Sequence, residues 1–358
     1  MVMKKGSRGN DTLNGTASVD LIYGFLGNDT IDGKAGNDKL VGGGGNDKIY
    51  GGTGNDWLYG GQGADKLYGG AGNDFIFSAG EFLNPYGTND KSADQIDAGA
   101  GDDYVTIGKN DIALGGAGTD TLFFDIENED KVDAINLDFS NVGAKTARSI
   151  AAAGTGYAAT KAGQFENVDL FAGNAKIGSK IIGSNGDDLL QMSLDSSQLL
   201  TGKGVSIYGG RGNDEIEGSG AGDTMNGGKG NDKIDGGFGG ADNLSGGAGY
   251  DSFVIDVNSF LRAADADMIQ DFSRTDDIVG INVSDGEIDF GNETNLLRSG
   301  ATTPVSNTAA GVAQFLYNTS TGVLSVDING VTAGGVTVLA TFANKVHLTA
   351  QDFSIEYL

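Results

Sequence analysis

A nine-residue period constrains this chain more than any other feature of its sequence. From Gly6 to Phe77 the period repeats eight times without a break, and every copy has glycine at position one, aspartate at position six and Leu or Ile at position eight. Eight glycines in register have a chance probability on the order of 10⁻⁹ at the average glycine frequency. A strict short period is the signature of a solenoid in which each coil contacts only its neighbours.

The residue types of the period indicate its structure. Residues of the type Gly-Gly-x-Gly-x-Asp form a turn, because glycine permits positive φ and aspartate favours turns. The next three residues place one aliphatic side chain between two outward positions, which is the alternation of a very short strand. Since such a strand cannot stand alone, we expect stacked coils with parallel ladders. Carboxylates stacked about 4.8 Å apart need a cation, and carboxylate and carbonyl oxygens suit Ca²⁺.

Composition narrows the classes of function. The chain has 358 residues with 63 glycines and two prolines, and the glycines do not fall at every third position, which excludes a collagen helix. Its 23 basic and 49 acidic residues give a net charge of −26, which argues against nucleic-acid and anionic-membrane partners and favours a divalent cation. Without cysteine, the chain has no disulfide, thiolate metal site or cysteine nucleophile.

Two further expectations concern location. No run approaches the eighteen apolar residues of a membrane-spanning helix, so we predict no transmembrane segment. The first residues, Met-Val-Met-Lys-Lys, are followed from Gly6 by polar residues and not by an apolar core. The sequence therefore predicts no cleavable N-terminal signal peptide.

These nonads resemble the GGxGxDxUx repeats of the repeats-in-toxin (RTX) proteins, a calcium-binding motif. The resemblance implies an all-β fold: a right-handed parallel β-roll with two nonads per eighteen-residue coil, followed by a β-rich C-terminal cap. In that family, an ion takes the carbonyls of positions two and four and the position-six carboxylate of one turn. It also takes positions one, three and six of the turn eighteen residues later.

Carried over to this chain, the resemblance implies five calcium sites, each formed by two triplets of residues. The four in the first block are Phe25, Gly27, Asp29 with Gly42, Gly44, Asp47; Lys34, Gly36, Asp38 with Gly51, Thr53, Asp56; Gly43, Gly45, Asp47 with Gly60, Gln62, Asp65; and Gly52, Gly54, Asp56 with Gly69, Ala71, Asp74. The fifth joins Gly210, Gly212, Asp214 with Gly227, Lys229, Asp232. The second nonad has Ser18 in place of glycine, which leaves Asp11 and Asp20 outside this set.

Less regular turns supply the remaining candidate ligands. The repeat returns at 98–106 and 115–123, resumes from 183 to 254 with one ten-residue copy, and is followed at 266–281 by a segment that resembles the end of an RTX roll. The candidates from these turns are Asp103, Asp120, Asp188, Asp223, Asp242, Asp251, Asp267, Asp271 and Asp277.

The register of the repeat divides the chain into four parts. We expect a first β-roll block at 1–123, a non-repeat β insertion that continues the solenoid at 124–182, a second block at 183–254, and a C-terminal cap at 255–358. In the RTX family an uncleaved C-terminal signal is recognised by the type I secretion machinery. The resemblance therefore implies export without an N-terminal signal, to the cell surface or the extracellular space.

The sequence does not predict an enzyme. With His347 as its single histidine, the chain cannot form H-E-x-x-H, and it contains no G-x-S-x-G. The leading interpretation is a non-enzymatic extracellular structural or cell-surface protein that self-associates as a homo-oligomer or surface assembly. The alternatives are a small membrane-active RTX effector and a polysaccharide-binding roll that uses position-nine aromatic columns. These columns contain Tyr23, Tyr50, Tyr59, Tyr68 and Phe77.

The same composition predicts a link between calcium and folding. A glycine-rich acidic chain has a large unfolded-state entropy and strong self-repulsion, so the ion-free form is expected to be substantially disordered. We therefore expect the chain to fold when it meets external calcium.

Overall fold

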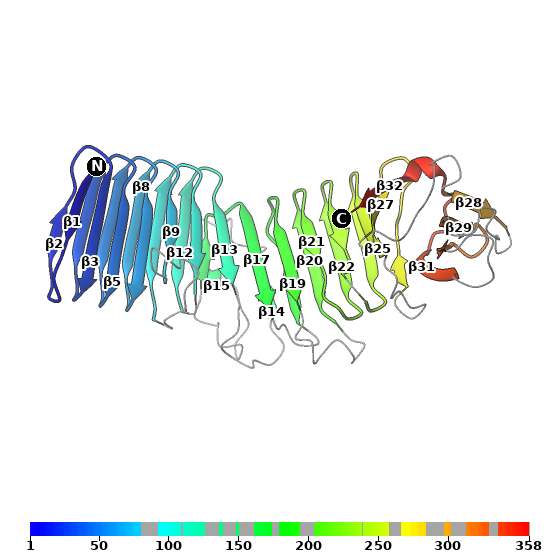
Figure 1. The fold of residues 1–358 in the computed structure, drawn as a ribbon, viewed down its shortest axis with the longest axis horizontal. Helices are drawn as coiled ribbons and strands as arrows, with labels where there is room; N and C mark the ends of the chain where they lie inside the picture. The colour runs from blue at the N-terminus through cyan, green and yellow to red at the C-terminus, as the bar shows by residue number, and fades with distance from the viewer. Residues whose placement is uncertain are drawn as a thin grey trace. The chain divides into compact units, whose positions relative to one another are not determined.

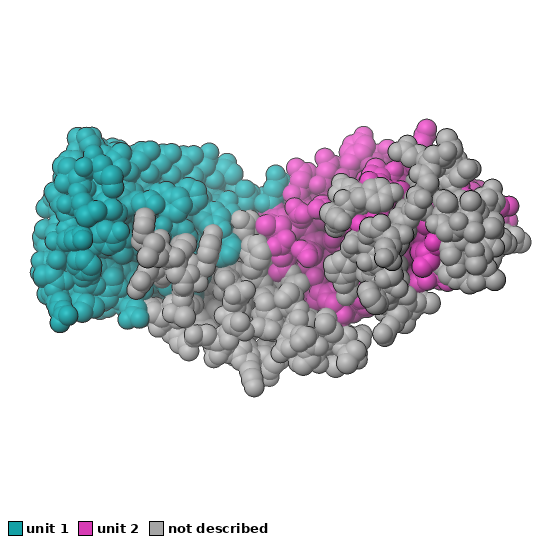
Figure 2. All heavy atoms as spheres, viewed as in Figure 1, with its two compact units in different colours: residues 1–171, 184–187 teal, residues 172–183, 188–358 magenta. Residues whose placement is uncertain are grey.

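The computed structural model describes thirteen stretches of the chain. They are residues 1–79, 92–108, 110–125, 136–138, 148–149, 161–173, 179–193, 204–237, 239–257, 266–283, 297–301, 313–328 and 336–357. The chain divides into two compact units, coloured separately in Figure 2. Unit 1 contains residues 1–171 and 184–187, and unit 2 contains residues 172–183 and 188–358.

Unit 1 is a stack of coils, each of which contributes one strand to each of two parallel sheets (Figure 1). The first sheet contains β1 (Val2–Lys5), β3 (Asp20–Leu26), β5 (Lys39–Gly44), β7 (Trp57–Gln62), β9 (Phe75–Phe77), β11 (Tyr104–Ile107), β13 (Thr121–Asp125) and β17 (Asn167–Gly173). The second contains β2 (Thr12–Asn14), β4 (Thr30–Ala35), β6 (Lys48–Thr53), β8 (Lys66–Ala71), β10 (Gln95–Ala100), β12 (Ile112–Ala117) and β16 (Lys161–Gly163). Along the chain between β13 and β16 are β14 (Asn136–Asp138) and β15 (Arg148–Ser149), and β15 pairs antiparallel with β16.

Unit 2 repeats this arrangement. One parallel sheet contains β19 (Leu189–Ser193), β21 (Glu215–Glu217), β23 (Lys233–Asp235), β25 (Ser252–Val257), β27 (Ile278–Val283) and β32 (Phe353–Tyr357). The other runs from β18 (Lys180–Ile182) through β20 (Ser206–Arg211), β22 (Thr224–Lys229), β24 (Asn243–Ala248) and β26 (Asp267–Ile269) to β31 (Val336–Phe342). It then turns antiparallel through β30 (Val323–Asp327) and β29 (Gln314–Asn318), with β28 (Leu297–Gly300) parallel at its edge.

The nine-residue period sets both register and core. Lys39 pairs with Leu21 on one side and with Trp57 on the other, so one coil is eighteen residues. The position-eight side chains point into the space between the sheets, where Ile31, Leu40 and Ile49 are fully buried. The burial of one aliphatic side chain per strand, about 1.5–3 kcal/mol each, supports strands that are too short to be stable alone.

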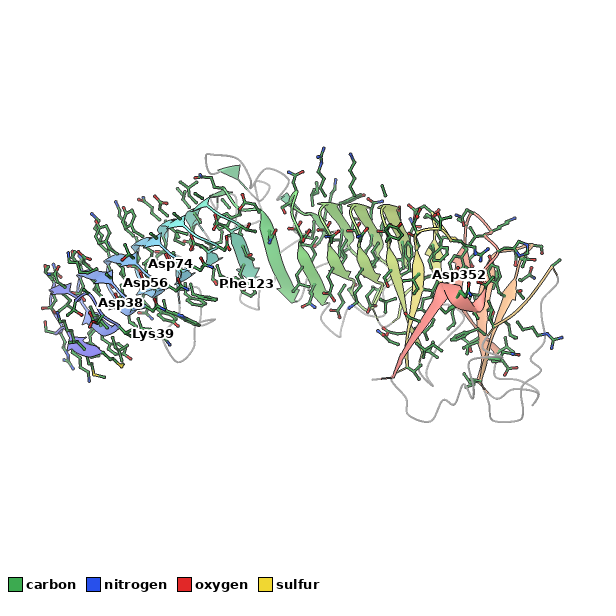
Figure 3. All side chains as sticks on the ribbon, turned by 90° about the horizontal axis from the view of Figure 1, so that it is seen from above. Asp38, Lys39, Asp56, Asp74, Phe123 and Asp352 are labelled. Atoms are coloured by element: carbon green, nitrogen blue, oxygen red, sulfur yellow. The ribbon has the colours of Figure 1, made fainter. Side chains whose placement is uncertain are left out.

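The predicted fold class is confirmed. The described residues form mainly parallel β-sheets with no α-helix, and one short 3₁₀ turn, η3 (Ala350–Asp352), precedes β32. Beside it, Arg274 Nε donates to Asp352 Oδ2 at 3.1 Å, and Asp352 is labelled in Figure 3. The four-part division of the chain stays a prediction.

Position two of the nonad has a positive φ wherever the turn is regular. Phe25 and Lys34 adopt φ of 80° and 81°, and Gly43 and Gly52 adopt 111° and 113°. A Cβ added to Gly52 would overlap the carbonyl oxygen of Lys34, one coil earlier. Phe25 and Lys34 follow turns whose position-two residues, Ser7 and Thr16, do not have positive φ. Position two therefore has to be glycine only where its turn stacks on a regular turn one coil earlier.

We expect Gly52→Ala to destabilise the calcium-loaded chain by about 2 kcal/mol, because the new Cβ meets a backbone carbonyl and φ is strained. Lys34→Ala is the matched control, since position 34 has the same sign of φ and already carries a Cβ. It should lose only the exposed pair of Lys34 with Asp32, about 0.5 kcal/mol or less. Chemical denaturation at saturating calcium measures both, and equal losses would contradict this account of position two.

Candidate calcium-binding turns

The position-six aspartates of unit 1 form two rows, one for each side of the roll. One row contains Asp11, Asp29, Asp47, Asp65, Asp94 and Asp111, and the other contains Asp20, Asp38, Asp56, Asp74, Asp103 and Asp120. Within a row, each backbone N–H donates to Oδ1 of the next aspartate. Asp38 donates to Asp56 at 2.7 Å, and Asp56 donates to Asp74 at 2.8 Å. Figure 3 shows these three residues on successive coils.

The second carboxylate oxygen of most of these aspartates has no partner. The residues whose Oδ2 is buried and accepts no hydrogen bond include Asp29, Asp38, Asp47, Asp56, Asp74, Asp103 and Asp120. Asp38, Asp56 and Asp74 are fully buried. A buried, charged oxygen without a hydrogen bond is strongly unfavourable. A bound cation or a proton on the carboxylate would therefore stabilise each of these turns.

The pKa values of these carboxyls reflect this environment. Burial, opposed by the backbone hydrogen bond and reinforced by the charge of neighbouring aspartates, raises the pKa of Asp56 and of Asp74 from 3.8 to about 7. The same causes raise the pKa of Asp47 to about 6. Raised pKa values indicate that burial in the turns disfavours the ionised form, which a bound divalent cation would stabilise.

Oxygen atoms from two coils converge on the position-one glycines. A Cβ built on Gly51 would lie 2.5 Å from both Asp56 Oδ2 and Gly69 O. On Gly33 it would lie 2.5 Å from Asp38 Oδ2 and 2.6 Å from Gly51 O. The position-six carboxylate of one turn thus meets the position-one carbonyl of the turn eighteen residues later, as the family pattern implies. Carboxylate and carbonyl oxygens are the donors that Ca²⁺ prefers.

The other predicted ligands are backbone carbonyls. The carbonyls of Lys34 and Gly36, at positions two and four, are directed at Gly52 and Gly54 of the next coil. Position-three carbonyls accept a backbone N–H from the preceding turn. These acceptors are Gly44, Thr53, Gln62, Ala71 and Lys229. Among the described residues no three acidic or histidine side chains converge, so each site would combine carbonyls with two carboxylates.

The second block also has two rows, and only one of them consists entirely of aspartates. In one row Asp188, Asp214, Asp232, Asp251 and Asp277 are linked by N–H to Oδ1 bonds of 2.9–3.0 Å. In the other, Val205 precedes Asp223, Asp242 and Asp267. Asp271 lies in neither row, because it accepts bonds from Ser245 Oγ and from the N–H groups of Gly246 and Gly247.

A serine or threonine at position two donates to the Oδ2 atom that has no hydrogen bond in the regular turns. The N–H of Ser7 donates to Asp11 Oδ2 at 2.6 Å, and that of Thr16 donates to Asp20 Oδ2 at 2.6 Å; both hydroxyls add a second bond. The same N–H bond joins Ser219 to Asp223 at 2.5 Å and Ser273 to Asp277 at 2.7 Å. The sequence carries a signal for these turns, a hydroxyl residue four positions before the aspartate.

The asparagine at position five was also missed. Asn46 N–H donates to Asn28 Oδ1 at 2.8 Å, and Asn55 N–H donates to Asn37 Oδ1 at 3.0 Å. In the second block, Asn231 N–H donates to Asn213 Oδ1 at 2.8 Å. Asparagine stands at this position in six of the eight uninterrupted nonads. These bonds connect consecutive turns beside the aspartate rows.

The described part of the chain contains no helix that is long and apolar enough to cross a membrane.

No curated protein matches the chain. Among solved structures, the extracellular lipase LipA from Serratia marcescens is 12% identical, with a TM-score of 0.17, over 97% of this chain and 38% of that chain. This chain thus spans little more than a third of that lipase, and so low a score supports no inference.

A family model described as the RTX calcium-binding nonapeptide repeat (4 copies) matches residues 5–40, 41–76, 90–109, 108–128 and 208–240. The matched segments contain the regular turns of both aspartate blocks. RTX nonapeptide repeats bind Ca²⁺ at multiple sites, and the paired oxygens and unsatisfied carboxylates of this fold suit that ion. This chain therefore contains RTX calcium-binding nonapeptide repeats, and the matched segments are folded as a parallel β-roll.

Proposed function

We propose that this chain is a secreted, non-enzymatic protein that folds on external calcium and serves as a self-associating structural component of the extracellular space or cell surface. The observation that carries the proposal is the series of fully buried carboxylates whose second oxygens have no partner, with Asp38, Asp56 and Asp74 at its centre. The five ligand sets carried over from the family are the proposed ion sites. They are supported by the pairs of carboxylate and carbonyl oxygens that converge beside Gly33 and Gly51.

The calcium dependence follows from binding linkage. If each site has a Kd near 10⁻⁴ M, a tenfold excess of calcium stabilises the folded chain by about 1.4 kcal/mol per site, or about 7 kcal/mol for the five sites. A gain of this size equals the stability of a whole domain. At cytosolic calcium, far below that Kd, the gain vanishes. The proposal includes export of the ion-free chain by the type I machinery, since an unfolded chain is what a channel can pass.

The alternative functions have less support. Tyr59 and Phe77, expected on the surface, are 1% and 3% exposed. In the other sheet Tyr50 and Tyr68 stack at 4.9 Å and 12°. Rings stacked in this way cover each other's faces and present their edges, whereas a sugar packs against an open face. This geometry weakens the polysaccharide-binding alternative, and the membrane-active alternative has no specific support among the described residues.

Sedimentation velocity from excess chelator to about 10 mM calcium, a range that brackets the expected Kd, tests the proposal. We expect an extended monomer in chelator, a compact species as calcium rises, and larger reversible species above that point. A compact species that stays monomeric at every calcium and protein concentration would contradict self-association. Liposome leakage or glycan-array binding by that monomer would then support one of the alternatives.

A further inference from the structure

We propose that Glu166, which lies outside every nonad, binds a calcium ion together with Asp120 and so completes the second aspartate row of unit 1. This inference rests on the proposed function of the regular turns, and it adds a site that the nine-residue period does not contain.

Glu166 occupies the position of an aspartate in that row. The N–H of Asp120 donates to Glu166 Oε2 at 2.9 Å, the bond that every earlier member of the row makes to the next aspartate. The carbonyl of Asp120 accepts the N–H of Asn167 at 3.1 Å, as the carbonyl of Asp38 accepts that of Trp57 at 2.8 Å. Strand β17 pairs with β13 in the register Thr121 to Asn167. Asn167 is therefore at position seven and Glu166 at position six.

The ligand environment around Asp120 is that of a regular site. Asp120 is fully buried, and its Oδ2 accepts no hydrogen bond. A Cβ built on Gly115 would lie 2.6 Å from Asp120 Oδ2 and would overlap Gln164 O. The carbonyl of Gln164 thus stands where the position-one carbonyl of the following coil stands at Gly51. An unpartnered carboxylate oxygen and a carbonyl oxygen converge here, beside the carboxylate of Glu166.

The turn that carries Glu166 is shorter than a nonad turn. Strand β16 pairs with β12 so that Gly163 faces Leu114, at position nine. Only Gln164 and Phe165 then separate Gly163 from Glu166, where a nonad has five residues. Phe165 is fully buried and Glu166 is exposed. A longer acidic side chain compensates for a shorter turn, which explains why glutamate takes the place of aspartate.

The shortened turn leaves fewer donors for the ion. Gly116 and Gly118 provide the position-two and position-four carbonyls of the first turn, and Gly116 O also accepts Gln164 Nε2 at 3.2 Å. The second turn lacks a position-three carbonyl. We therefore expect this site to bind calcium more weakly than the regular ones and to fill last. Its ion would join β16 and β17 to a turn that precedes them by 46 residues.

Counting calcium per chain tests the site. The full chain and its variants are equilibrated at a calcium concentration that saturates the wild type, the folded fraction is isolated by size exclusion, and bound calcium is measured by elemental analysis. We expect Glu166→Gln and Asp120→Asn each to lose the one ion that these two residues share. Glu217→Gln, which removes an exposed acid on β21, is the matched control and should lose none.

The amide of Glu166→Gln keeps an oxygen that can accept the N–H of Asp120. If Glu166 only accepted this hydrogen bond and bound no ion, the variant would leave the ion count unchanged. An unchanged count in this variant, with wild-type affinity at every site, would overturn the inference. A wild type that binds no calcium would instead overturn the proposed function itself. The two failures are therefore distinguishable.

Discussion

Replacement of Asp56 by asparagine removes two calcium ions and destabilises the calcium-loaded chain by about 3 kcal/mol, at about 1.4 kcal/mol per ion. Asp56 belongs to two of the proposed ligand sets, because its Oδ1 accepts Asp38 N–H and its own N–H donates to Asp74 Oδ1. Asparagine keeps one oxygen for the hydrogen bond, but it loses the charge and replaces the second carboxylate oxygen with an NH2 group. Chemical denaturation at fixed calcium, with a count of bound ions, measures the effect.

The control for this variant is Asp32→Asn. Asp32 lies at position nine of its nonad, outside the turns, and pairs with Lys34. Its replacement removes the same charge and should change neither the ion count nor the stability by more than about 0.5 kcal/mol. Equal effects of the two variants would show that net charge, and not ion coordination, stabilises the roll.

Without calcium, acid should stabilise the fold; with calcium, acid should destabilise it. In the ion-free roll, burial raises the pKa of Asp56, Asp74 and Asp120 from 3.8 to about 7. The folded form therefore binds more protons than the unfolded form between about pH 4 and pH 7. Its stability is greatest below about pH 4 and is lost as the pH rises through about 7. With calcium bound, the carboxylates are ionised in the folded form, and protons compete with the ion.

The measurement is the β-sheet signal in circular dichroism between pH 8 and pH 4, in chelator and in saturating calcium. Acidification also reduces the repulsion that arises from a net charge of −26. Because salt screens exposed charges far more than buried ones, the gain in chelator should persist in 1 M NaCl if burial is its cause. A loss of signal on acidification under both conditions would contradict the raised pKa values.

The period predicted the parallel sheets and the buried position-eight column, and the resemblance to the RTX proteins implied the eighteen-residue coil. Once the coil length is known, contacts between equivalent residues eighteen apart follow from the repeat. The rows formed by Asp38, Asp56 and Asp74 follow from the same symmetry. The predicted ligand sets stay a prediction, although the paired oxygens at Gly33 and Gly51 have the expected partners.

The features that the nine-residue period does not predict depend on local backbone geometry. Whether the Oδ2 of a turn aspartate accepts a hydrogen bond depends on φ at position two. The N–H groups of Ser7 and Thr16 donate to this oxygen, whereas those of Phe25 and Lys34, which have positive φ, do not. The place of Glu166 in the row depends on the pairing of β17 with β13 across a long insertion. Neither the sign of φ nor this pairing is visible in a nine-residue consensus.

Far-UV circular dichroism of the full chain, recorded in excess chelator and at about 10 mM calcium, well above the expected Kd, shows whether the roll needs calcium to fold. At neutral pH, we expect a largely disordered spectrum in chelator and a reversible, cooperative gain of β-sheet as calcium is added. A complete β-sheet spectrum in excess chelator at neutral pH, unchanged by calcium, would contradict the claim that calcium bound at the turns stabilises the roll.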